Sequence, residues 1–193
     1  MTIHLLRHGK TPANEQQLFC GSTDIPLSPK GIDEIKELIK PGFYPQAEMI
    51  YTSGLIRAKQ TADLIYGHSN KREIPDLNEY DFGLFEMKHL DEIKDRADFI
   101  TWVNDESGNT KCPEGESQQD YIERVLRGFN TVLEETRSAG NDSVIIICHG
   151  GVIVRIMEKL FGENKTFSEW QPDNGRGYTI TYASDGLHSY QEI

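Results

Sequence analysis

The chain is 193 residues long, with 37% hydrophobic and 26% charged residues, and its formal net charge at pH 7 is -11. This length fits one domain over residues 1–193 with a full hydrophobic core, and the composition is typical of a folded protein rather than a disordered one. The negative charge argues against nucleic acid or an acidic membrane as a partner, and an anionic substrate would need a strong local cluster of cations.

The first part of the chain alternates between strand and helix patterns. The helix after the first strand has Ser28 as its N-cap and Pro29 at its first position, and Pro41 with Gly42 ends it. The next helix carries apolar residues at helical spacing. The expected elements of this part are strands over residues 2–7, 47–53 and 71–75 and helices over residues 29–40 and 54–67.

Periodicity weakens over residues 78–115, apart from a helix expected near residues 89–103, so this segment is interpreted as an excursion over one face. Ser117 then caps a long helix that is expected to reach about Ser138. A strongly apolar strand, a helix and a hairpin turned at Asp185-Gly186 follow. These last elements are expected over residues 143–148, 152–162 and 177–193.

Strands that alternate with helices predict an α/β fold, here a three-layer α/β/α sandwich with a mainly parallel central sheet. In open sheets of this kind, ligands bind beyond the carboxyl ends of the strands. The residues that follow the three best-defined strands are therefore the first candidates for a functional site.

These three strand ends carry arginine, histidine and glycine. The first strand ends in Arg7-His8-Gly9, the second ends in Ser53 with Arg57 one helical turn later, and the strongest ends in His149-Gly150-Gly151. If the strands are parallel, two histidines and two arginines meet at one edge of the sheet. The glycines let the backbone approach a ligand closely, and the N-termini of the following helices favour an anion.

Two imidazoles, two guanidiniums and free backbone N–H groups describe a site for a phosphoryl group. Arginine can clamp two phosphate oxygens at once, and a neutral histidine can attack phosphorus. A second histidine, if protonated, can offset the charge on the equatorial oxygens of the transition state. The leaving alcohol still needs an acid. Glu79 is the preferred carboxylate, and Asp76, Asp81 and Glu86 compete with it.

On these residues the chain resembles the histidine phosphatase superfamily, the phosphoglycerate mutase-like enzymes, from residue 3 to about residue 155. Each motif alone is weak, but together and in the family's order they are highly specific. The segments that carry the resemblance are RHGKT (residues 7–11) with Asn14, Gly21 with DIPLS (residues 24–28), SGLIRAKQT (residues 53–61), LNE (residues 77–79) with Phe82-Gly83, GES (residues 115–117) and HGG (residues 149–151).

The resemblance implies a role for each candidate residue. His8 would be the phosphorylated nucleophile, Arg7 and Arg57 would hold the phosphoryl oxygens, His149 would assist in the same pocket, and Glu79 would donate the proton. It implies the three-layer sandwich as well, with residues 78–115 over the active site. The residues implied to add weaker contacts are Asn14, Thr11 and the Gly150 backbone toward phosphate, and Cys20 and Gly21 toward substrate.

The implied activity is hydrolysis of a small phosphorylated metabolite through a phosphohistidine, with no metal and no other cofactor. The segments DIPLSPKG and GES and the chain length are most similar to alpha-ribazole phosphatases and their broad-specificity relatives. Lys10 departs from the glutamate or glutamine of many members, and Met87 replaces a glycine after Phe85-Glu86. These departures concern the rim of the pocket and therefore the choice of substrate.

Two alternatives stay open. A phosphoglycerate mutase would use the same residues and return the phosphoryl group to its substrate; typical mutases are longer and carry extra basic residues over the site, whereas residues 80–115 here carry many acidic ones. A non-catalytic module would hold phosphorylated ligands without turnover, although the full set of core residues speaks against it. The oligomeric state is not predicted.

The remaining histidines are interpreted as bystanders. His4 shares a strand face with His8, but the nearby arginines and the lack of HxH or DxH spacing argue against a metal site. Cys20, Cys112 and Cys148 are scattered and odd in number, which predicts free thiols and a cytoplasmic location. No signal peptide is expected, and no apolar run approaches membrane length.

Overall fold

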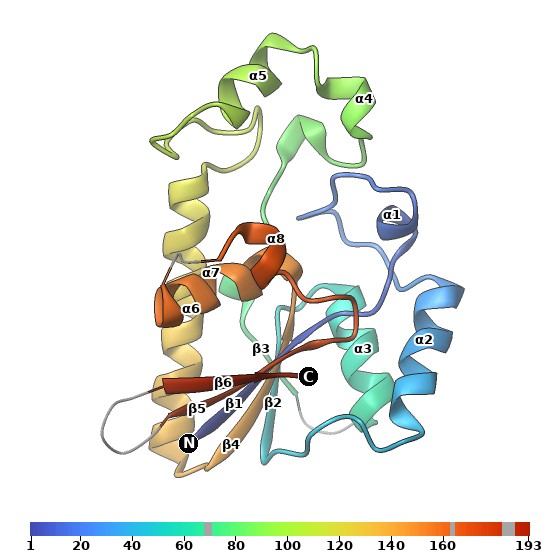
Figure 1. Cartoon of the computed structure of the whole chain (residues 1–193), viewed down its shortest axis with the longest axis vertical. Helices are drawn as coiled ribbons and strands as arrows, with labels where there is room; N and C mark the ends of the chain where they lie inside the picture. Colours follow the sequence, from blue (N-terminus) through green and yellow to red (C-terminus); the bar gives the residue numbers. More distant parts are fainter. Residues whose placement is uncertain (68–70, 163–164, 183–187) are drawn as a thin grey trace.

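The computed structural model describes residues 1–67, 71–162, 165–182 and 188–193 (Figure 1). One sheet has the strand order β3-β2-β4-β1-β5-β6. The first four of these strands are parallel, and β5 and β6 are antiparallel to their neighbours. The strands are β1 (Thr2–Arg7), β2 (Met49–Thr52), β3 (Lys71–Glu73), β4 (Ser143–Cys148), β5 (Gly177–Tyr182) and β6 (His188–Glu192).

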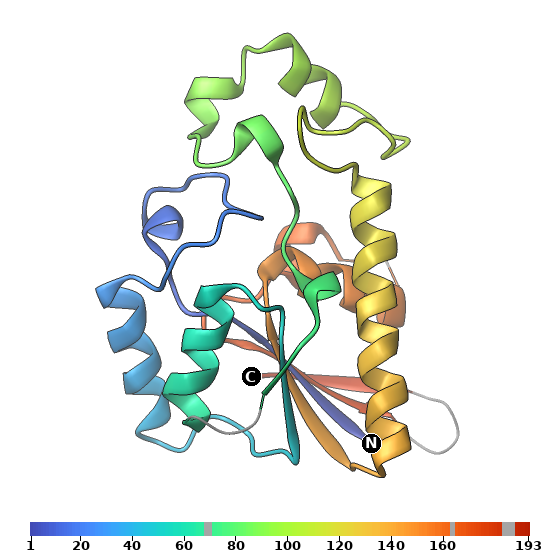
Figure 2. The same ribbon diagram turned by 180° about the vertical axis from the view of Figure 1, so that it is seen from behind.

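Helices cover both faces of this sheet, as Figures 1 and 2 show from opposite sides. Helices α2 (Pro29–Ile39) and α3 (Ile56–Tyr66) lie on one face, and α6 (Gln118–Ala139) and α7 (Gly150–Phe161) lie on the other. Successive side chains of β4 alternate between two hydrophobic cores, with Ile145 and Ile147 in one and Val144 and Ile146 in the other. The predicted three-layer α/β/α fold with a mainly parallel sheet is confirmed.

The helix boundaries follow the predicted caps. The hydroxyl of Ser28 accepts a hydrogen bond from the Gly31 N–H at 3.0 Å, and that of Ser117 accepts one from the Asp120 N–H at 3.1 Å. Helix α7 begins two residues earlier than predicted, because His149 is extended and serves as its N-cap. The two glycines after His149 therefore form the first turn of a helix, and their N–H groups point toward the strand ends.

The excursion differs from its prediction. In place of one helix over residues 89–103 there are two short ones, α4 (Leu90–Ile93) and α5 (Ala97–Val103), because Arg96 has an extended backbone and donates to the Asp98 carboxylate. Figure 1 shows both at the end of the molecule opposite the N-terminus. Four short helices were not predicted: α1 (Pro12–Glu15), η1 (Pro75–Leu77), η2 (Gly83–Phe85) and α8 (Phe167–Trp170).

The last two strands form the predicted hairpin, in which Tyr182 pairs with His188. Its proposed turn at Asp185-Gly186 lies outside the described residues. The three cysteines are free thiols. Within the described residues, none of the helices is both long and apolar enough to cross a bilayer.

Candidate active site

The sheet register brings the three predicted strand ends together. Arg7 of β1 lies beside Cys148 of β4, which places the next residues, His8 and His149, side by side. Their ring centroids are 5.1 Å apart in an edge-to-face arrangement. The Nε2 atom of His149 is 2.8 Å from the hydroxyl oxygen of Ser53, the residue that follows β2. One edge of the sheet therefore presents residues from three separate segments of the chain.

The His8 ring is held in one tautomer. Its Nδ1 atom is 2.7 Å from the carbonyl oxygen of Gly9, and a carbonyl oxygen only accepts, so Nδ1 carries the hydrogen and Nε2 keeps a free lone pair. Asn174 fixes the backbone by donating to the His8 carbonyl oxygen at 3.0 Å. Burial lowers the pKa of His8 well below its usual value, and Arg57 and Arg7 lower it further. His8 is thus a neutral imidazole oriented for attack through Nε2.

In the unliganded protein, His8 is expected to take up a proton only at a pH well below that at which free histidine does. Burial and the two arginines lower its pKa below the free value of about 6.5, so His8 stays neutral where free histidine is half-protonated. Nitrogen-15 NMR of the imidazole rings measures this, with Nε2 keeping the shift of an unprotonated nitrogen. Half-protonation of His8 at or above pH 6.5 would contradict the geometry.

The two arginines are anchored by backbone carbonyl groups. Arg7 donates through Nη1 to Pro172 at 2.8 Å, and its buried Nε has no partner among the described residues. Arg57 donates to the carbonyl oxygens of Thr23 at 2.8 Å and Gly21 at 2.5 Å, and it is only 1% exposed. Because neither guanidinium forms an ion pair with a carboxylate of the described residues, both keep a net positive field for an anion.

His149 completes the buried cluster. Its pKa is also well below the usual value, first through burial and then through Arg57 and His8. Its buried Nδ1 atom has no hydrogen-bond partner among the described residues. An unpaired polar atom at full burial is costly, so Nδ1 is a ready contact for an oxygen of a bound phosphoryl group.

Glu79 lies against the first turn of α7. Its Oε2 atom accepts from the Gly151 N–H at 2.9 Å, and its Oε1 atom accepts from the Tyr121 hydroxyl at 2.5 Å and from the Tyr80 N–H at 3.0 Å. Burial, and Glu79 itself, raise the pKa of Tyr121 well above its usual value, so this hydroxyl stays protonated and donates. The carboxyl group is therefore fixed in orientation beside the strand ends.

The three competing carboxylates have other partners. Asp76 pairs with Arg127. Asp81 accepts from the Ser22 hydroxyl and the Gly83 N–H. Glu86 accepts from the backbone N–H groups of the 21–23 loop, which supplies the carbonyl groups that hold Arg57. Of these four acids, the adjacent cavity is lined by Glu79.

This cavity has a volume of about 750 Å³. Arg7, Asn14 and Cys20 line it together with Glu79, whereas His8, at 5% exposure, is nearly enclosed. The side toward the excursion is formed by aromatic and polar residues. Among them are Phe19, Tyr80, Phe82, Trp102, Asp105 and Thr110.

The residues implied to make weaker contacts are placed differently from one another. The Asn14 carbonyl oxygen accepts from both the N–H and the hydroxyl of Thr11, so the Asn14 amide NH₂ is the end left to donate. Thr11 is 1% exposed and its hydroxyl caps α1. Cys20 lines the cavity. Gly21 contributes through its carbonyl oxygen, which accepts from Arg57. A side chain at Gly21 would collide with the Tyr80 carbonyl oxygen.

Sequence reasoning missed Gln171. A Cβ atom on Gly150 would lie 2.6 Å from the Gln171 Nε2 atom and 3.2 Å from the Arg7 Nε atom, so both donors crowd the first turn of α7. Gln171 also lines the cavity. No motif marks it, because its position depends on how the loop after α8 packs against the strand ends.

The sequence and the fold are similar to those of known proteins. The family profile of the histidine phosphatase superfamily (branch 1) matches residues 3–191. The adenosylcobalamin/alpha-ribazole phosphatase of Escherichia coli (strain K12) is 31% identical over 166 residues, which cover 84% of this chain and 80% of that protein. The solved alpha-ribazole phosphatase from Shigella flexneri has a TM-score of 0.87 at 27% identity, covering 100% of this chain and 96% of that one.

A more distant likeness concerns the fold alone. The phosphoglycerate mutase from Bacillus anthracis str. Sterne has a TM-score of 0.80 at 23% identity, covering 100% of this chain and 92% of that one. The fold is thus that of the phosphoglycerate mutase-like α/β proteins. The chain belongs to the histidine phosphatase superfamily.

Proposed function

We propose that this protein is a metal-independent phosphomonoester hydrolase that works through a phosphohistidine at His8. The observation that carries the proposal is the His8 tautomer: Nε2 keeps a free lone pair among Arg7, Arg57 and His149. This is the state a nitrogen nucleophile needs, in a setting that favours a phosphoryl anion. Residues 1–193 then act as one domain, with residues 78–115 as an excursion over the site.

The reaction has two steps. In the first, Nε2 of His8 attacks phosphorus in line, the bond from phosphorus to the ester oxygen breaks, and Glu79 gives its proton to that oxygen. In the second, water attacks the phosphohistidine, Glu79 takes a proton from the water, and the N–P bond breaks. His8 returns to its neutral form, and inorganic phosphate leaves. Arg7, Arg57 and His149 bind the phosphoryl oxygens in both steps.

Activity should persist in EDTA, because two guanidiniums and an imidazole already surround the phosphoryl oxygens. No cluster of metal-ligating side chains occurs within the described ranges. Phosphate release is measured with and without the chelator, and vanadate, which mimics five-coordinate phosphorus, should inhibit. Loss of turnover in EDTA that added metal restores would contradict this expectation.

The substrate we propose is a phosphomonoester of a bulky, ring-bearing alcohol, with alpha-ribazole 5'-phosphate as the specific candidate. Two observations support it: the cavity of about 750 Å³ exceeds what a phosphoryl group fills, and the rings of Phe19, Tyr80, Phe82 and Trp102 line it. The similarity to alpha-ribazole phosphatases points the same way. A cytoplasmic location, where three free thiols stay reduced, is part of the proposal.

A panel of phosphomonoesters ranked by kcat/KM tests this proposal. Alpha-ribazole 5'-phosphate, a mononucleotide, a hexose phosphate and 3-phosphoglycerate are compared, with phosphate release and isomerisation both followed. The ring-bearing esters are expected to rank first, with release of phosphate. Faster isomerisation of phosphoglycerate than hydrolysis of any ester would identify a mutase, and absence of any release above background would identify a binding module.

A further inference from the structure

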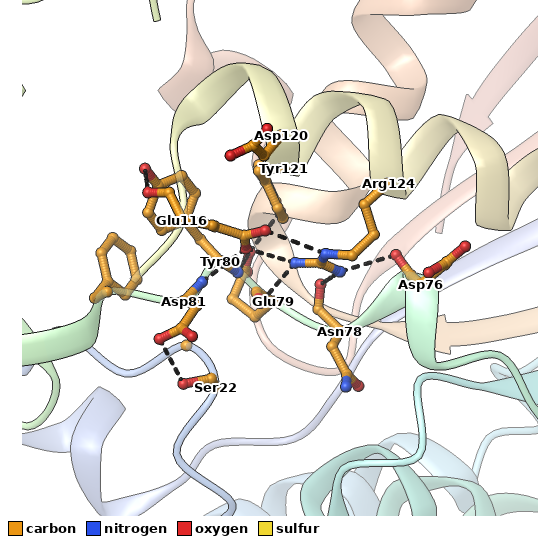
Figure 3. Close-up of polar contacts among 12 residues, drawn as sticks. Ser22, Asp76, Asn78, Glu79, Tyr80, Asp81, Glu116, Asp120, Tyr121 and Arg124 are labelled. Atoms are coloured by element: carbon orange, nitrogen blue, oxygen red, sulfur yellow. Dashed lines mark hydrogen bonds and ion pairs between the residues drawn. The ribbon is translucent and has the colours of Figure 1, made fainter. Parts of the chain in front are cut away.

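Arg124 of α6 reaches across to the segment that carries Glu79. Its Nη1 atom donates to the carbonyl oxygens of Asp76 at 2.9 Å and Asn78 at 2.8 Å, and its Nη2 atom donates to the carbonyl oxygen of Glu79 at 3.2 Å. Figure 3 shows these bonds converging on one guanidinium. Three backbone groups within four residues are therefore bound to a single side chain.

Glu116 holds Arg124 from the other side. The carboxylate accepts from Nη2 at 2.6 Å and from Nε at 3.2 Å, and it also accepts from the Asp81 N–H at 2.8 Å. Both partners are mostly buried, with side-chain exposures of 20% and 17%. A two-point arginine–carboxylate contact with this little solvent is better ordered than a surface pair. The backbone is thus clamped on both sides of Glu79.

The same helix also holds the Glu79 side chain. Tyr121 lies three residues before Arg124 on α6, so both side chains project from one helical face. Tyr121 donates to Oε1 of Glu79, while Arg124 binds its carbonyl oxygen. The carboxyl group and its backbone are therefore positioned by one rigid element.

We propose that Arg124, locked by Glu116, is a positioning residue for Glu79, which sets the carboxyl group within reach of the leaving oxygen. This inference rests on the proposed function of Glu79 as the acid. General acid catalysis depends on hydrogen-bond reach to the reacting atom, and small displacements of a catalytic group are costly. Arg124 itself meets no reacting atom, so its effect should appear in the proton transfers of Glu79, of which the first is the one to the leaving oxygen.

Arg127 provides a matched control. It lies one turn beyond Arg124 on α6 and pairs with the side-chain carboxylate of Asp76, at 62% side-chain exposure. It lies on the same helix as Arg124 and, like Arg124, contacts Asp76. Its guanidinium donates to the Asp76 carboxylate rather than to the backbone of Glu79. Arg127→Ala should therefore leave the first phosphoryl transfer unchanged.

The experiment follows formation of the phosphohistidine in single turnovers with an alkyl phosphate and with p-nitrophenyl phosphate. Arg124→Ala is expected to slow the alkyl substrate by up to about 10²-fold. The nitrophenyl substrate should react at nearly the original rate, since nitrophenolate leaves without a proton. Arg124→Lys should fall in between. Arg124→Ala should add little to the effect of Glu79→Gln in the double variant.

Equal slowing of both substrates by Arg124→Ala, or an equal effect of Arg127→Ala, would overturn the proposal. A circular dichroism spectrum and a thermal unfolding transition like those of the unchanged protein show that the variant is folded. If Arg124→Ala gives no folded protein, Glu116→Gln is the second variant, and it should show the same selective loss. If Glu79→Gln itself is unselective, the assigned acid is wrong; if Glu79→Gln is selective and Arg124→Ala is not, only the positioning role fails.

Discussion

His8→Ala is expected to lower kcat for every phosphomonoester by a factor on the order of 10⁶, the scale seen when a covalent nucleophile is removed from an enzyme. The reason is that Nε2 of His8 is the atom that receives the phosphoryl group. Steady-state phosphate release at saturating substrate measures the effect. The loss should be large for alkyl and aryl esters alike, because both transfer the phosphoryl group to the same Nε2 atom.

His4→Asn is the matched control for this change. His4 lies on β1, the strand that leads to His8, and its Nδ1 atom is paired with the Thr179 hydroxyl at 2.9 Å, a contact that asparagine can also make. This variant should keep nearly full activity. A loss in kcat below about tenfold for His8→Ala would show that His8 is not the nucleophile.

Glu79→Gln is expected to lose about 10²–10⁴-fold in the first transfer from an alkyl phosphate, the usual worth of general acid catalysis. Glutamine keeps the shape, and its one carbonyl oxygen can still accept from Tyr121 and the Tyr80 N–H. Its NH₂ group cannot accept from the Gly151 N–H, and it has no acidic proton to give. With p-nitrophenyl phosphate the phosphohistidine should form at a similar rate before and after the change. Quenched single turnovers isolate this step, whereas steady-state turnover also contains the attack of water.

Arg57→Ala should behave differently. The Arg57 clamp acts on the phosphoryl group and not on the alcohol, so both substrates should slow together. If Glu79→Gln slows the two substrates equally, Glu79 is not the acid. Asp81 and Glu86 would then need a new conformation to serve, because neither of them lines the cavity as Glu79 does.

The fold and the centre of the site were predictable because their signals are local. Apolar strands that end in Arg7-His8-Gly9 and His149-Gly150-Gly151 place their following residues at one edge once the strands are parallel. Caps at Ser28 and Ser117 set two helix starts directly from the sequence. The resemblance to a known family added the roles that position alone does not define.

The support of Glu79 was not predictable because its partners are distant along the chain. Tyr121 is 42 residues away from it, and Arg124 is 45 residues away. In the sequence, Tyr121 matches a core-facing position of an amphipathic helix, and nothing distinguishes its hydroxyl. The division of the excursion's predicted helix into two was missed for a different reason, since the extended backbone at Arg96 goes with a local contact to Asp98 that no helical pattern marks.

The most direct measurement of the central claim is the trapping of the phosphorylated protein. The enzyme is mixed with a phosphorus-labelled ester, quenched within the first turnover and digested, and the labelled peptide is sequenced. Label is expected on the peptide that contains His8, lost in acid and retained in alkali as an N–P bond requires, and absent from His8→Ala. Acid-stable label, or label on the same peptide of His8→Ala, would contradict a phosphohistidine at His8.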